Sequence, residues 1–164
     1  MPGGVGAKFG KELEEARTLA AGQIIDKSLD DAVSPKLRPR IQFQDAEDPF
    51  LKLAEMFPEA AVLQAYQELE ACFDTNKDII QSFDKSGQMR DSINTIIDGL
   101  RGARLLSDDW MELYKRIRKL RKLAVHGRRG QGRITPGEAI EYRALVNALK
   151  EQLSVAIREY RVRQ

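Results

Sequence analysis

Four segments of the chain repeat apolar residues at the three- and four-residue spacing of an amphipathic α-helix. The first covers 58–83 and the second covers 89–102. The third covers 107–126, and its apolar stripe consists of Trp110, Leu113, Ile117, Leu120 and Ala124. The fourth starts at Thr135, and its stripe consists of Ala139, Tyr142, Val146, Leu149, Leu153, Ala156 and Tyr160. Because short connections join these segments, the pattern predicts an all-α antiparallel bundle of four to five helices.

Capping residues indicate where three of these helices begin. Pro58 suits a first helical position. Ser107 is a good N-cap and is followed by two aspartates, which interact favourably with a helix N-terminus. Thr135 and Glu138 have the spacing of a capping box. No proline interrupts 59–135, so long helices are sterically allowed there.

The first 57 residues follow a weaker pattern. We expect an acidic helix over 8–22, whereas the prolines at 35 and 39 break any helix over 23–47, where 41–43 is the one extended candidate. The sequence therefore predicts an N-terminal acidic helix and irregular arm over 1–57, followed by the helical bundle over 58–164.

Composition excludes several classes of protein. Hydrophobic residues make up 42% and charged residues 32%, which is typical of a globular domain. A single cysteine, Cys72, and a single histidine, His126, exclude a disulfide framework and make a zinc site untenable, so no metal or cofactor is expected. No apolar run approaches the ~20 residues that span a membrane, and the N-terminus has no secretory signal, so a cytoplasmic location is expected.

Charge is distributed unevenly along the chain. Residues 1–112 contain 13 Lys/Arg and 21 Asp/Glu, a net charge of −8. Residues 113–164 contain 14 Lys/Arg and 4 Asp/Glu, a net charge of +10. Two interpretations are open: the basic half binds a phosphate-bearing partner, or it pairs with the acidic half of the same fold.

The third helix ends in the segment that carries the most chemistry. His126 is its last residue, and Arg121 lies five positions earlier. Imidazole can move the proton of a ribose 2′-hydroxyl or of a leaving 5′-oxygen, while guanidinium can hold a phosphate and stabilise its added negative charge. Further cations that could hold RNA phosphates surround this pair: Arg118, Lys119, Lys122, Arg128 and Arg129.

Helix geometry separates the two candidate catalytic residues. Five positions correspond to a rotation of about 140°, so Arg121 and His126 do not share a face. A joint site needs a distortion near Gly127 or a second copy of the chain. The alternative role of His126 is simply a favourable interaction with the helix C-terminus. The glycines after Gly127 match no phosphate-binding loop, and Cys72 is expected to be a small core residue.

These features together resemble the HEPN superfamily, the higher eukaryotes and prokaryotes nucleotide-binding domain. The resemblance rests on Arg121-x4-His126 in the penultimate long helix, followed by a loop and the Thr-Pro-Gly-Glu-Ala start of the next helix. Residues 58–70 resemble the first core helix of small bacterial HEPN-like domains, and 100–106 resemble the connection into the motif helix. The resemblance covers roughly 58–157.

The resemblance implies a helical bundle and a metal-independent endoribonuclease, in a toxin or phage-defence setting. Active members are commonly homodimers in which the two motifs face each other. Arg121 would then bind and polarise the scissile phosphate, and His126 would act in acid–base catalysis. Members often carry Asn, Asp or another polar residue directly after the arginine, where this chain has Lys122.

Two other functions are open. Many HEPN relatives are non-catalytic, so the same fold would bind nucleic acid or nucleotide, or serve as a scaffold, without cutting. The other alternative is that the chain is an interaction protein whose acidic region over 8–31 binds a protein partner.

Overall fold

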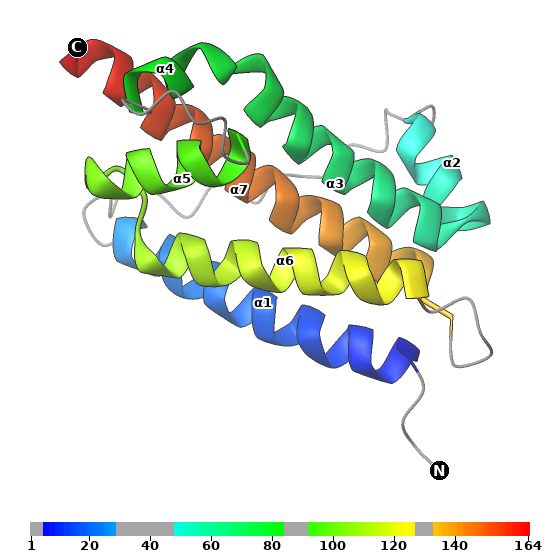
Figure 1. The fold of residues 1–164 in the computed structure, drawn as a ribbon. Coiled ribbons are helices and arrows are strands. Elements are labelled where there is room, and N and C mark those ends of the chain that lie inside the picture. Colours follow the sequence, from blue (N-terminus) through cyan, green and yellow to red (C-terminus); the bar gives the residue numbers. More distant parts are fainter. Residues whose placement is uncertain (1–4, 29–47, 84–91, 127–132) are drawn as a thin grey trace.

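The computed structural model describes residues 5–28, 48–83, 92–126 and 133–164, and all regular structure in them is helical (Figure 1). This confirms the all-α class. The elements in chain order are α1 (Val5–Ser28), α2 (Pro49–Met56), α3 (Pro58–Thr75), the 3-10 turn η1 (Lys77–Ile79), α4 (Ile80–Phe83), α5 (Ser92–Gly102), α6 (Asp108–His126) and α7 (Pro136–Arg163). No helix in these ranges combines the length and the apolar character needed to cross a bilayer.

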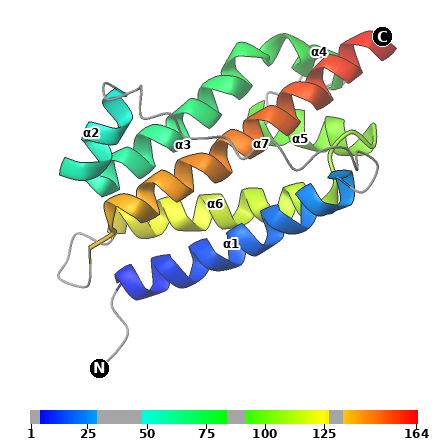
Figure 2. The same ribbon diagram turned by 180° about the vertical axis from the view of Figure 1, so that it is seen from behind.

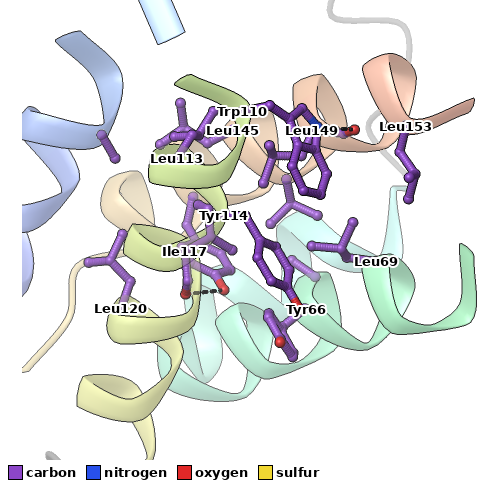
Figure 3. Close-up of a cluster of buried hydrophobic side chains, with 14 of the residues drawn as sticks. Tyr66, Leu69, Trp110, Leu113, Tyr114, Ile117, Leu120, Leu145, Leu149 and Leu153 are labelled. Carbon is purple, nitrogen blue, oxygen red and sulfur yellow. Dashed lines mark hydrogen bonds between the residues drawn. The ribbon is translucent and has the colours of Figure 1, made fainter. Parts of the chain in front are cut away.

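The helices α3, α6 and α7 enclose the centre of the hydrophobic core (Figure 3). Trp110 and Tyr114 of α6 stack with their ring planes 14° apart and their centroids 5.3 Å apart. The Trp110 indole N–H donates to the carbonyl of Leu149 at 3.3 Å, and the Tyr142 hydroxyl donates to the carbonyl of Ile117 at 3.1 Å. These hydrogen bonds satisfy the polar atoms of two large buried rings and fix α6 against α7.

The predicted starts and apolar faces of α6 and α7 are confirmed. Every residue of the two stripes predicted for 107–126 and for the helix after Thr135 is buried. The Ser107 hydroxyl accepts a hydrogen bond from the backbone N–H of Trp110. Thr135 and Glu138 form both hydrogen bonds of the capping box. These bonds satisfy N–H groups that a helix start otherwise leaves without partners.

The N-terminal helix packs into the same core as the rest of the protein. α1 runs beside α6 in both Figure 1 and Figure 2 and buries Phe9, Leu13, Ala16 and Ala20, spaced at three and four residues. The Phe9 ring lies 6.3 Å from that of Tyr142 in α7. The sequence predicted an acidic helix over 8–22, and α1 extends this helix at both ends, to Val5–Ser28.

The long helix predicted over 58–83 is interrupted at Asn76. The Asn76 side chain donates to the carbonyl of Cys72 at 2.8 Å, which ends α3, and η1 and α4 continue the chain in a new direction. Asn competes with helical hydrogen bonding in this way because its side chain is short and polar. Cys72 is half-buried against the core. The predicted extended segment over 41–43 lies outside the described residues.

The short helix α2 was missed by the sequence pattern, although its start carries a recognisable signal. The Asp48 side chain caps it by accepting the backbone N–H of Phe50 at 2.9 Å, and Pro49 occupies the first turn. The second carboxylate oxygen accepts a hydrogen bond from Arg143 of α7 at 2.7 Å. The Arg143 guanidinium also lies 4.2 Å from the Phe50 ring centroid, so one arginine ties α2 to α7.

The Asp48–Arg143 pair is expected to make stability depend on pH. The hydrogen bond from Arg143, followed by that from the Phe50 N–H, lowers the pKa of Asp48 below its ordinary value. Because the folded-state pKa is lowered, the ionised carboxylate stabilises the folded protein at pH values above the unfolded-state pKa of about 3.9. This contribution decreases below that pH and disappears as pH falls through the folded-state pKa.

We therefore expect Asp48→Asn to be less stable than the parent at pH 7, and the deficit to be smaller at about pH 3, below the unfolded-state pKa. Asparagine still caps the helix, so the variant isolates the charge. Urea unfolding at the two pH values measures the difference. Asp109→Asn, at an exposed carboxylate in the first turn of α6, controls for general acid effects. An Asp48→Asn deficit of the same size at both pH values contradicts the assigned role of the charge.

Candidate functional site

The structure places Arg121 and His126 on one helix but in different surroundings. Arg121 is half-buried on the side of α6 that faces α3, whereas His126 is exposed at the last residue of α6. Their side chains diverge as the helical rotation predicts. One copy of the chain therefore does not bring the two candidate catalytic residues to a common point.

Arg121 lies over an aromatic ring. Its guanidinium carbon is 4.7 Å from the ring centroid of Tyr66 in α3. Tyr66 is only 4% exposed, and Figure 3 shows it among the core side chains between α3 and α6. The Tyr142 hydroxyl belongs to the same neighbourhood, because Tyr66 and Arg121 both influence its pKa, which burial raises well above the ordinary value. Arg121 thus stands at the junction of α3, α6 and α7.

Two cations on the opposite side of α6 are paired with α1. Arg116 forms ion pairs with Glu12 at 3.3 Å and with Glu15, and Lys119 forms one with Glu12. The Glu12 side chain is 15% exposed and that of Arg116 is 26% exposed, so this network is partly shielded from solvent and from salt. Here the basic half of the chain pairs with its own acidic half, which was one of the two interpretations of the charge distribution.

This pairing changes the expected binding surface. Lys119 was predicted to hold RNA phosphate, but its ammonium is already near a carboxylate. Glu12 and Glu15 belong to the acidic region expected to bind a protein partner, but they contact α6 of their own chain instead. No sequence motif identified the glutamates of α1 as partners of α6. The signal that points to this pairing is the opposite net charge of the two halves of the chain.

Three of the predicted phosphate-binding residues, Arg118, Lys119 and Lys122, are exposed, and of these Lys119 is paired with Glu12. Arg118 lies 5.8 Å from the Tyr114 ring centroid. Arg118 and Lys122 lie four residues apart and therefore on one face of α6, on the side that α1 does not cover. Arg128 and Arg129 lie outside the described residues. Among the predicted site residues that the structure describes, Arg118 and Lys122 thus form the open cationic part of α6, and half-buried Arg121 lies next to Lys122 in the chain.

A surface depression of about 760 Å³ lies at the other end of α6. It is lined by residues from the end of α5, the connection over 103–107 and the start of α6, including Arg101, Arg104 and Asp108. Arg101 pairs with Asp108 at 2.9 Å, and the remaining charged residues of the lining, Asp98 and Arg104, have opposite signs, so the depression has no net charge. No cluster of three His, Cys, Asp or Glu residues suited to a metal occurs among the residues described by the structure.

Comparison of the chain with protein-family models, curated proteins and solved structures finds no match. A functional assignment therefore depends on the geometry of the chain itself. The sequence did not identify Tyr66 as part of the candidate site. It was predicted only as one member of an apolar stripe, because no local signal links it to Arg121, which lies 55 positions further along the chain.

Proposed function

We propose that the chain is a HEPN-like helical bundle that binds RNA through α6 and cleaves it as a homodimer without a metal, in a toxin or phage-defence setting. The single observation that supports this most is Arg121. Within the described residues it has no carboxylate at ion-pair distance, whereas Arg116 and Lys119 on the same helix do. An arginine kept away from carboxylates has its donors available for a phosphate.

The chemistry assigned to the site is transesterification of the RNA backbone. The 2′-oxygen forms a bond to phosphorus while the bond from phosphorus to the 5′-oxygen breaks, leaving a 2′,3′-cyclic phosphate. His126 moves a proton, either taking it from the 2′-hydroxyl or giving it to the 5′-oxygen. Arg121 binds the non-bridging oxygens and stabilises the charge that accumulates on them.

The divergence of these two residues supports the proposal of a homodimer. Two copies related by a two-fold axis near α6 would supply Arg121 of one chain and His126 of its partner to one cleft. The same symmetry repeats the cationic face on both sides of that cleft. The test is an RNA-cleavage assay in excess chelator together with light scattering: cleavage by a protein that stays monomeric at high micromolar concentration contradicts the composite site.

A second function is favoured by the same divergence. A single chain presents Arg118 and Lys122 on the face of α6 that also carries His126, whereas Arg121 lies on another side of the helix. These cations suffice to hold RNA phosphates, while the proposed catalytic pair of Arg121 and His126 is not assembled and the RNA is not cut. The two functions differ in one measurement. A parent protein that binds RNA with steep salt dependence, yet leaves it intact, is the non-catalytic module.

The pairing of α1 with α6 predicts a gain of RNA affinity. Glu12→Gln combined with Glu15→Gln should release Lys119 and leave Arg116 with Glu112 at 3.8 Å as its remaining carboxylate partner, so RNA binds more tightly at low salt. Each further phosphate contact should steepen the slope of log K against log salt by about 0.7 for a single strand. Fluorescence anisotropy over a salt series measures both quantities.

The matched control for this prediction is Glu14→Gln. Glu14 lies on α1 and its carboxylate pairs with Arg17 of the same helix at 3.6 Å, so its removal frees no cation of α6. The double variant should therefore exceed Glu14→Gln in both affinity and slope. Equal values for the two proteins contradict a contribution of Arg116 and Lys119 to RNA binding.

A further inference from the structure

The contact between α3 and α6 contains an arginine that lies over an aromatic ring and forms no ion pair within the described residues. The Arg121 guanidinium lies 4.7 Å from the Tyr66 ring centroid, within the distance of a cation–π interaction. A cation–π contact uses the charge of the guanidinium and forms no ion pair or carboxylate hydrogen bond, and the guanidinium carries five N–H donors in its plane. The ring can therefore restrain the arginine without using the donors that bind a phosphate.

Tyr66 is itself held firmly. It is 4% exposed in a core element, and its neighbours on α3, Val62 and Leu69, are fully buried. A rigid ring restricts the rotamers of the long arginine side chain, so less conformational entropy is lost when a ligand binds. An arginine restrained by a carboxylate would instead use part of its N–H donors on that partner, as Arg116 does with Glu12.

We infer that Tyr66 is a positioning residue for Arg121: its ring holds the guanidinium so that the edge donors face an RNA phosphate. This inference rests on the proposed function, because it takes RNA phosphate as the ligand of Arg121. It adds a residue of α3 to a site that the motif confines to α6. Arg118 is a weaker case of the same contact, since it lies 5.8 Å from the ring centroid of Tyr114.

The test changes the charge distribution of the ring at position 66 while preserving the shape of the ring. Tyr66 is replaced by phenylalanine and, in a second protein, by pentafluorophenylalanine, which has a similar size but a reversed ring quadrupole. Binding of a single-stranded RNA is measured by anisotropy at fixed salt. We expect the Tyr66→Phe protein to retain RNA binding and the fluorinated protein to bind about 3- to 10-fold more weakly.

Two controls separate positioning from a structural role. In an Arg121→Gln background, fluorination at position 66 should no longer change RNA affinity, because the cation is gone. Pentafluorophenylalanine at Phe73, a buried ring of α3, should leave affinity unchanged in the parent background. Thermal unfolding confirms that each protein is folded.

The outcomes distinguish the inference from the proposed function. A parent that does not bind RNA overturns the proposed function and the inference with it. A parent that binds RNA, with equal affinity for the Tyr66→Phe and fluorinated proteins, overturns the inference alone. An equal loss in the Arg121→Gln background also overturns it, since the effect would then not pass through the arginine. A loss confined to proteins that retain Arg121 supports it.

Discussion

His126→Ala is expected to reduce RNA cleavage by about 10²- to 10⁴-fold while the protein remains folded. His126 is the only imidazole of the chain and is assigned the proton transfer. It is exposed at the end of α6, so truncation opens no cavity and should change the free energy of unfolding by about 0.5 kcal/mol or less. Gel analysis of RNA products in excess chelator, with circular dichroism of the same samples, measures both effects.

Val125→Ala is the matched control for this variant. Val125 is the adjacent residue of α6 and is 43% exposed, so its truncation removes a similar volume without removing an acid–base group. Cleavage by Val125→Ala should equal that of the parent, and both should leave a 2′,3′-cyclic phosphate. If purified His126→Ala cuts RNA at the parental rate, the proposed mechanism is wrong.

Local patterns were sufficient to predict α5, α6 and α7. The stripe that contains Trp110 and the stripe that contains Tyr142 are both buried, and the hydroxyls of Ser107 and Thr135 cap their helices. Such features depend only on residues within one or two helical turns of each other, so they can be predicted from the sequence directly.

Contacts between distant helices could not be predicted in the same way. Periodicity identifies which face of a helix is apolar but does not identify the neighbour that covers it. The Arg116–Glu12 pair joins residues 104 positions apart, and the sequence therefore did not place α1 against α6. For the candidate site, helix geometry predicted that Arg121 and His126 diverge, but it contained no information about Tyr66.

Phe9→Ala is expected to destabilise the fold by about 3–5 kcal/mol. Phe9 is fully buried, and its ring lies 6.3 Å from that of Tyr142. Truncation leaves a cavity where α1 meets α7, and the side chains around it cannot close the space completely. This magnitude is a large part of the 5–15 kcal/mol that stabilises a typical domain. Urea unfolding followed by circular dichroism measures the change.

The result of Phe9→Ala decides whether the N-terminal helix is a structural part of the fold. Lys8→Ala serves as the control, because Lys8 is the preceding residue and is exposed, so its change should stay within about 0.5 kcal/mol. A loss below about 1 kcal/mol for Phe9→Ala would give α1 the role of a peripheral arm, since helices that contribute little buried surface detach at little cost. The expected large loss instead means that a chain shortened to 58–164 exposes the faces of α6 and α7 that α1 covers. Such a chain also lacks the carboxylates of Glu12 and Glu15, which pair with α6.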